Sequence, residues 1–171
     1  MAVFTLSAVD VPKLMLVQQD CYSEELVESA AVMAARIAAC SQTCWGYFIE
    51  QQMAGYLLAY PSVLGSITPL AAAFPLYQNA NCLYLHDMAI SVDFRGQSLA
   101  PELLKHATAE TEKMGLQALA LVAVQGAEGY WAKQGFVKEM NITTEQQAIL
   151  DTYLPEIACY MTKQLRSEPK L

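Results

Sequence analysis

The chain has 171 residues, of which 54% are hydrophobic and 16% charged, and its formal net charge is −7. This length and composition predict one globular domain, residues 1–171, with a single hydrophobic core, and they exclude an intrinsically disordered chain. The acidic balance argues against nucleic acid as a partner, because binding it needs clustered basic side chains, and favours a cationic partner.

The N-terminal part predicts a strand followed by two helices. Alternating apolar and polar residues indicate a strand over Val3–Ala8. Asp10 is a suitable N-cap for a helix over Val11–Cys21. Ser23 is a second N-cap candidate, and the acidic residues behind it favour a helix over Glu24–Cys40, since they would lie at the positive end of its dipole.

A hairpin and a long connection come next. The runs Cys44–Gln51 and Met53–Tyr60 read as two strands joined by a short turn. Residues 61–81 then form a loop within a stretch, Gln51 to His86, that has no Asp, Glu, Lys or Arg. Because long loops in compact domains are usually functional or disordered, and this one is rich in apolar side chains, we expect a packed lid or a partner surface, which allows a homodimer.

The second half alternates strands and helices. Cys82–Val92 is almost continuously apolar, which predicts a central strand covered on both faces. A helix follows it, with an apolar stripe from Ala100 to Met114, and Gly115 ends this helix. The remaining elements are a strand over Leu116–Val124, a helix over Glu128–Lys133 and two strands over Phe136–Met140 and Tyr153–Thr162.

The sequence also indicates the state of the cysteines and whether a metal site or a membrane attachment is expected. The five cysteines are scattered and odd in number, so we expect reduced thiols in a cytoplasmic protein. Because there is no Cys-x-x-Cys pair and the two histidines lie far apart, no metal site is expected. Prolines and glycines interrupt the uncharged stretch before any apolar run reaches 18 residues, and the N-terminus lacks the basic start of a signal peptide, so no membrane attachment is expected.

The junction after the central strand carries the most specific chemistry. The segment Asp93-Phe94-Arg95-Gly96 leads through small residues into a helix, so unpaired N–H groups lie at its first turn beside the positive end of the helix dipole. Such a junction binds phosphate or diphosphate. A Rossmann domain would instead need a Gly-x-Gly-x-x-Gly turn after an early strand, and this loop has one glycine and comes mid-chain.

Two blocks of the sequence resemble the GNAT-type N-acetyltransferases. Leu85–Ile90 followed by Arg95–Ala100 is similar to the family's acetyl-CoA motif, Gln/Arg-x-x-Gly-x-Gly/Ala at the head of a helix. Ala127–Phe136 is similar to the family's later helix and its Gly-Phe ending. The resemblance implies an α/β (mixed α+β) fold, with a mostly antiparallel mixed sheet of six to seven strands, about four flanking helices and two splayed central parallel strands. Residues 82–137 would then bind acetyl-CoA, and residues 1–81 would form the acceptor-side half.

The same resemblance implies which residues hold the cosubstrate. Main-chain amides of Gln97, Ser98, Leu99 and Ala100, with Arg95 and Gly96, would grip the diphosphate, and Met88, Ala89 and Ile90 would line the pantetheine arm. Three positions depart from the family pattern: Ser98 stands at its central glycine, Trp131 where many members have a tyrosine that protonates the thiolate, and Val124 where an asparagine is often found. Trp131 is therefore expected as a wall of the pocket, and proton donation would pass to Tyr130, to water or to nothing.

His86 and Asp87 are the candidate proton acceptors. Both lie in a strand whose other residues are almost all apolar, where a buried polar side chain is costly without a partner or a task. The alternative is a structural hydrogen-bonded pair that anchors neighbouring loops. His86 is favoured slightly, because the ordinary titration range of histidine suits a base at neutral pH.

The leading hypothesis is thus an acetyl-CoA-dependent N-acetyltransferase that acts on a primary amine of a small molecule or protein. The departures at Ser98 and Trp131 leave open a second hypothesis, a module that binds CoA or acyl-CoA without turnover. A third, an assembly protein, depends on the uncharged segment as a contact surface.

Overall fold

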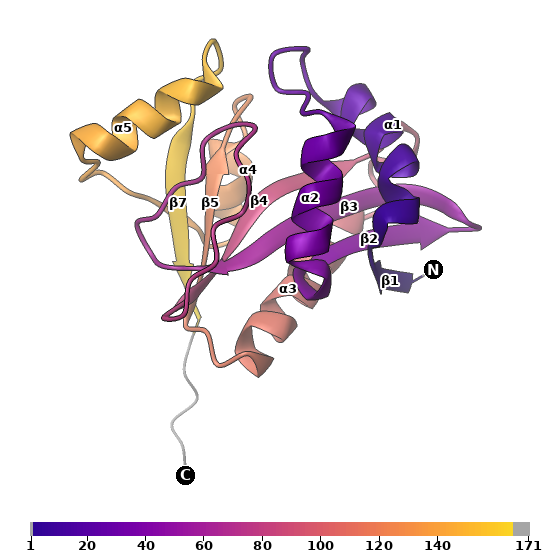
Figure 1. The fold of residues 1–171 in the computed structure, drawn as a ribbon, viewed down its shortest axis with the longest axis horizontal. Coiled ribbons are helices and arrows are strands. Elements are labelled where there is room, and N and C mark those ends of the chain that lie inside the picture. The colour runs from indigo at the N-terminus through magenta and orange to yellow at the C-terminus, as the bar shows by residue number, and fades with distance from the viewer. Residues whose placement is uncertain (1, 166–171) are drawn as a thin grey trace.

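The computed structural model describes residues 2–165. These residues form a seven-stranded mixed sheet with helices packed against it (Figure 1). The strand order is β1-β2-β3-β4-β5-β7-β6, and β4 and β5 are parallel while the other neighbours are antiparallel. The strands are β1 (Ala2–Thr5), β2 (Cys44–Ile49), β3 (Gln52–Ser62), β4 (Cys82–Ile90), β5 (Ala118–Ala123), β6 (Val137–Lys138) and β7 (Cys159–Gln164). This confirms the expected mixed, mostly antiparallel sheet.

Helices cover both faces of the sheet. In this part of the chain the α-helices are α1 (Val11–Cys21), α2 (Ala30–Ala39), α3 (Leu99–Lys113), α4 (Glu128–Lys133) and α5 (Thr144–Leu150). One core layer lies under α1, α2 and residues 63–81, with Leu14, Met33 and Phe74 in it. The other lies under α3 and α4, with Leu103 and Trp131 in it. In Figure 1, α1 and α2 lie in front of the sheet and α3 lies behind it.

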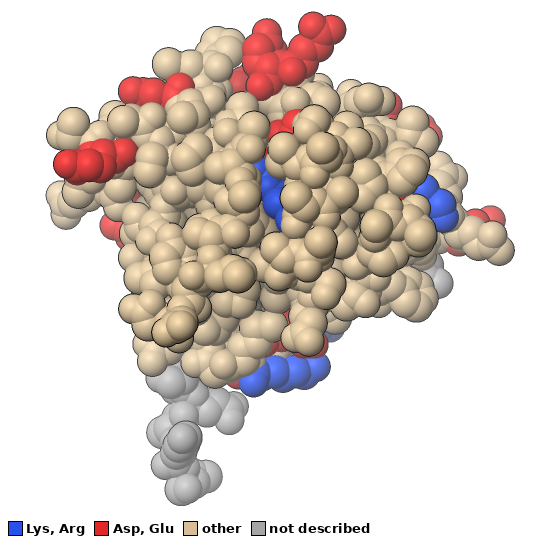
Figure 2. All heavy atoms as spheres, in the orientation of Figure 1, with Lys and Arg blue, Asp and Glu red and all other residues tan. Residues whose placement is uncertain are grey.

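The outer face of the first layer is poor in charge. Figure 2 shows this side of the molecule, over α1, α2 and residues 63–81, with most of its surface formed by uncharged side chains. The absence of acidic and basic residues between Gln51 and His86 accounts for part of this surface. None of the helices among the described residues is long and apolar enough to cross a membrane.

The two central parallel strands diverge, as expected. They pair from Cys82 opposite Ala118 to Leu85 opposite Leu121, while β4 continues to Ile90 alongside β3. Beyond Leu85, β4 is still paired with β3 on one edge but no longer with β5 on the other. The unpaired edge of β4 therefore faces a gap between β4 and β5.

A β-bulge in β4 interrupts its pairing with β3 just before that gap. Leu58 lies opposite Asp87 and the next residue, Ala59, lies opposite Leu85, so His86 is an extra residue without a partner. Side chains normally alternate between the faces of a strand, and one extra residue resets the alternation. His86 and Asp87 therefore both point to the α1/α2 face of the sheet.

Two predicted elements are wrong in part. The second helix begins at Ala30 rather than at Glu24, because Ser29 is its N-cap and accepts a hydrogen bond from the Val32 amide at 3.3 Å. Residues 22–29 are instead a non-helical connection against the sheet.

The predicted last strand, Tyr153–Thr162, is a strand only from Cys159. A short 3₁₀ turn ending at Tyr153 precedes it, after α5, a helix that the prediction omitted. The other predicted strands and helices are confirmed within a few residues, and all five cysteines are free thiols.

Candidate active site

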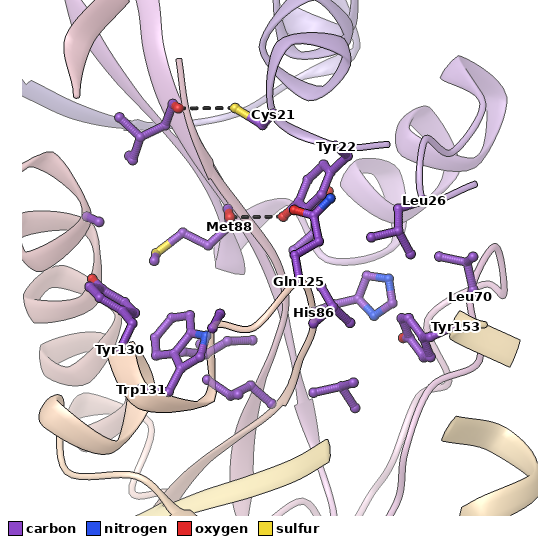
Figure 3. Close-up of a pocket in the computed structure, with 18 of the residues that line it drawn as sticks. Cys21, Tyr22, Leu26, Leu70, His86, Met88, Gln125, Tyr130, Trp131 and Tyr153 are labelled. Carbon is purple, nitrogen blue, oxygen red and sulfur yellow. Dashed lines mark hydrogen bonds between the residues drawn. The ribbon is translucent and has the colours of Figure 1, made fainter. Parts of the chain in front are cut away.

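A cavity of about 470 Å³ occupies the gap between β4 and β5 and continues to both faces of the sheet. On the α3/α4 side its walls include Met88, Tyr130 and Trp131. On the α1/α2 side they include His86 and Tyr153, and Figure 3 shows these two groups of side chains on opposite sides of the gap. The divergence of the strands therefore produces one continuous passage through the sheet, not two separate pockets.

The loop before α3 forms one end of this passage. Gly96 has φ +80° and Ser98 has φ +61°, both in the left-handed region, and α3 begins at Leu99. A Cβ at Gly96 would meet no atom within 4 Å, so there is open space beside this residue. Arg95 and Ala100 line the cavity at this end. An open, exposed loop with helix N–H groups and an arginine fits a diphosphate.

Ser98, which stands at the family's central glycine, adopts a left-handed conformation here with φ +61° and ψ +26°. A non-glycine residue in that region costs about 1–2 kcal/mol. Its amide remains available, because the loop is exposed and the serine side chain makes no capping bond. The substitution thus costs some stability and leaves the N–H cradle intact.

The free edge of β4 presents main-chain groups to the gap. The Ser91 amide donates to Ala54 of β3, so the groups of Ala89 also face β3 and those of Met88 and Ile90 face the gap. The Met88 and Ile90 carbonyls accept from Tyr22 Oη at 3.0 Å and Cys21 Sγ at 3.1 Å (Figure 3). The N–H groups of the same two residues point to the same edge.

The residues predicted to line the pantetheine arm have side chains on different faces of β4. Those of Met88 and Ile90 line the cavity, whereas that of Ala89 is buried in the opposite core layer. Trp131 is buried against Phe136, with ring centroids 5.3 Å apart, and forms a cavity wall. Tyr130 beside it is 36% exposed and lines the same wall. Val124, at the family's asparagine position, also lines the cavity.

Asp87 is buried, and its carboxyl group is already hydrogen-bonded. Tyr22 Oη lies 2.7 Å from its Oδ1, and Tyr56 Oη donates to its Oδ2 at 2.8 Å. Burial raises the pKa of Asp87, which favours the neutral acid. A protonated Asp87 can donate to Tyr22, whose own proton then goes to the Met88 carbonyl, so every partner in this group is satisfied. Asp87 thereby fixes the β4 edge to the end of α1.

His86 has a different environment. Its side chain is 2% exposed, and its Nε2 lies 3.5 Å from Glu28 Oε2. Its Nδ1 is buried and has no hydrogen-bond partner among the described residues. The residue as a whole is only half-buried although its side chain is covered, so the exposed part of His86 is the main chain of the bulge.

Sequence reasoning missed Glu28 and Arg36, which complete this side of the cavity. Arg36 NH1 and NH2 donate to the two carboxylate oxygens of Glu28 at 2.5 and 2.6 Å, and both side chains are buried. The pair also fastens the long loop: the Ala71 amide donates to Glu28, and Arg36 donates to the Ala72 carbonyl. No local pattern predicts this pair, because the groups that it joins come from three separate segments of the chain.

Comparison with protein-family models matches residues 11–136 to the Acetyltransferase (GNAT) family. The chain belongs to this family. The match covers well over half of the chain and includes both the loop before α3 and the bulged strand. Membership confirms the resemblance inferred from the sequence, and it makes CoA or an acyl-CoA the expected ligand of the passage. A comparison with curated proteins found no matching sequence.

Solved structures share the fold of this GNAT domain at low identity. The GNAT-like decarboxylase GphF in complex with isobutyryl-CoA aligns with a TM-score of 0.77 and 14% identity, covering 97% of this chain and 100% of its own. The loading GNATL domain of CurA from Lyngbya majuscula gives 0.75 and 11%, covering 95% and 96%. The ribosomal-protein-S18-alanine N-acetyltransferase from Escherichia coli gives 0.67 and 18%, covering 99% and 98%. Among the described residues no cluster of His, Cys, Asp and Glu could hold a metal ion.

Proposed function

We propose that this GNAT protein transfers an acetyl group from acetyl-CoA to a primary amine of a small molecule or protein, by direct attack within a ternary complex. The observation that carries the proposal is the continuity of the cavity, which runs from Arg95 at the phosphate-binding loop, past the β4 edge, to His86. A thioester entering from one face and an amine entering from the other would meet at the bulge. Holding the two reactants together is itself worth several kcal/mol of the barrier.

The β4 edge supplies the groups that orient the thioester. The main-chain N–H groups of Met88 and Ile90 face the gap, and one of them would donate to the thioester carbonyl oxygen as negative charge develops there. Trp131 and Leu121 line the same gap with apolar surface. Because these walls exclude water, the hydrogen bond to the developing oxyanion is stronger than it would be in solvent.

His86 is the residue proposed to take the proton from the amine. Its Nδ1 is buried and carries no hydrogen bond among the described residues, and His86 is one of the residues that line the cavity. The amine nitrogen forms a bond to the thioester carbon, the C–S bond breaks, the proton lost by nitrogen goes to His86, and CoA leaves as the thiolate. The thiolate then takes a proton from water or from Tyr130, which lines the opposite wall. Asp87 is less suitable as a base, since two tyrosine hydroxyls already occupy its carboxyl group.

The test is thiol release from acetyl-CoA with a panel of primary amines, from diamines to peptides with free N-termini. The proposal predicts amine-dependent release in the wild type and a loss of release, with CoA affinity kept, in His86→Gln. His106→Gln is the matched control, because His106 lies on α3 and packs against Trp45, away from the cavity. CoA binding without release for any amine would favour the module that binds CoA without turnover.

A second candidate is decarboxylation of a carboxyacyl-CoA, in which a carboxyacyl-CoA and a proton give an acyl-CoA and CO₂. The specific observation in its favour is that neither carboxylate lining the cavity is free to hold an ammonium group: Glu28 is paired with Arg36 and Asp87 with two tyrosines. The relative in complex with isobutyryl-CoA is named a decarboxylase. Release of CO₂ from malonyl-CoA without release of thiol would establish this reaction in place of acetyl transfer.

A further inference from the structure

The imidazole of His86 is held by two aromatic rings and a carboxylate. Its ring packs edge-on against Phe74, with centroids 5.4 Å apart, and is stacked beside Tyr84 at 6.1 Å. These contacts fix the plane of the ring. Its Nε2 edge then faces Glu28, which comes from the connection between α1 and α2, and its Nδ1 edge carries no partner among the described residues.

Both the side chain and the main chain of Glu28 are held by several hydrogen bonds. The Arg36 guanidinium binds both carboxylate oxygens, and the Ala71 amide donates to Oε1 at 2.7 Å. Its main chain is held as well, because Gln18 exchanges hydrogen bonds with the Glu28 amide at 2.6 Å and carbonyl at 3.4 Å. The carboxylate therefore has one position, 3.5 Å from Nε2.

Glu28 is also the ionised acid of this cluster. The titratable groups around His86 are Glu28, Arg36 from α2, Asp87 and Tyr84 from β4, and Tyr153 from the 3₁₀ turn after α5. Although burial opposes it, the contacts with His86 and Arg36 lower the pKa of Glu28 to about 2. Burial raises the pKa values of Asp87 and of the two tyrosines, so these three groups favour their neutral forms.

A fixed negative charge beside one nitrogen of a neutral imidazole favours the tautomer that carries its proton on that nitrogen. We propose that Glu28 is a positioning residue for His86, which holds the proton on Nε2 and leaves the lone pair on the unpartnered Nδ1 as the atom that accepts the proton of the amine. The role of Nδ1 in turnover depends on the function proposed above, whereas the tautomer assignment does not.

Kinetics of a double-mutant cycle test the coupling between the two residues. Glu28→Gln is expected to lower kcat/KM for acetyl transfer by roughly 10- to 100-fold, the usual effect of removing the residue that orients a functional histidine. In a His86→Ala background the same substitution should change kcat/KM by less than about twofold, because Glu28 acts through the imidazole. Equal losses in the two backgrounds would assign Glu28 a structural role and overturn the proposal.

The substitution Glu28→Gln leaves a buried guanidinium without its carboxylate, which can unfold a protein. Glu28→Gln combined with Arg36→Met removes both charges together and keeps similar volume, so it is the second variant of the cycle. In this variant kcat/KM is expected to fall as it does in Glu28→Gln, because the carboxylate beside Nε2 is lost in both. A kcat/KM equal to that of the wild type would contradict the proposal.

Imidazole ¹⁵N spectra measure the tautomer without any turnover. The chain has two histidines, so His106→Gln assigns the His86 signals by difference. When the imidazole is neutral, the wild type should show a protonated Nε2 and a bare Nδ1, and the Glu28→Gln/Arg36→Met variant should show a larger share of the other tautomer. A wild-type His86 with its proton on Nδ1 would overturn the proposal. If the tautomer is as stated but no amine is acetylated, the function proposed above fails and the positioning role of Glu28 stands.

Discussion

A carboxylate placed at Gly96 should weaken coenzyme binding. Gly96 lies in the exposed loop between Arg95 and the start of α3, and a Cβ built on it meets no atom within 4 Å. The substitution Gly96→Asp therefore creates no steric clash. Its aspartate would lie next to the N–H groups that the account assigns to the diphosphate.

The size of the effect follows from charge repulsion. Two unit charges about 4 Å apart repel by about 1 kcal/mol in water and by about 4 kcal/mol at the effective dielectric constant of a protein surface. Since the loop is exposed and the diphosphate carries more than one charge, we expect a loss of about 1.4–2.8 kcal/mol. This corresponds to a roughly 10- to 100-fold weaker Kd for CoA.

Two control variants separate charge from backbone strain. Gly96→Ala keeps the strain of a side chain at φ +80° without the charge. Gly115→Asp puts the same residue at φ +71° and in equally open space at the other end of α3, about 22 Å away along the helix axis. Isothermal titration calorimetry with CoA should give near wild-type affinity for both controls, and the loss in Gly96→Asp should shrink as salt is added. Wild-type affinity in Gly96→Asp, or an equal loss in Gly115→Asp, would refute the reasoning.

Three further predictions concern His86, the core beneath α3 and the Glu28–Arg36 pair. His86→Ala should lower kcat by about 10²–10⁴-fold while the Kd for CoA changes little, measured by thiol release and calorimetry, and equal losses in both would exclude a role as base. Leu103→Ala, at a fully buried position of α3, should cost about 2–5 kcal/mol in urea unfolding, against less than about 0.5 kcal/mol for Val137→Ala on the surface. Because contacts with His86 and Arg36 lower the pKa of Glu28 from 4.5 to about 2, its ionised form adds stability above pH 4.5 that is lost as the pH falls towards 2. Urea midpoints from pH 6 to pH 2 should therefore fall less in Glu28→Gln/Arg36→Met than in the wild type, and parallel curves would contradict this pKa.

The elements that the sequence predicted well are those with local signals. Val11–Cys21 and Glu128–Lys133 match α1 and α4 in both bounds. Asp10 and Pro12 mark the start of the first helix, and Gln134-Gly135 marks the end of the second. The loop Arg95–Ala100 was identifiable because a strand, a glycine and a helix follow one another directly. The capping box between Thr143 and Gln146 was an equally local signal for α5, and it could have identified that helix.

The start of α2 depends on tertiary contacts. Ser23 and Ser29 are both plausible N-caps from sequence alone. The choice between them is made by Glu28, whose side chain pairs with Arg36 and whose main chain bonds to Gln18. No pattern within residues 22–29 contains that information, so the acidic residues there were misread as the first turn of a helix.

The bulge at His86 is the second feature that local patterns do not contain. Strict alternation would place His86 and Asp87 on opposite faces of β4. The pairing with β3 places both on the α1/α2 face, where they have different partners: Asp87 bonds to two tyrosines and His86 faces Glu28. The sequence therefore singled out the two residues as candidates, but it did not predict that the bulge would place them on one face with different partners.

The central claim is that one passage brings CoA past the β4 edge to His86. A crystal structure of the protein with CoA measures it most directly. The account predicts diphosphate oxygens within about 3 Å of main-chain nitrogens in residues 96–100, and the sulfur between Met88 and Trp131 on the side of the sheet opposite His86. Coenzyme bound elsewhere, with the 96–100 amides and the gap between β4 and β5 both unused, would contradict it.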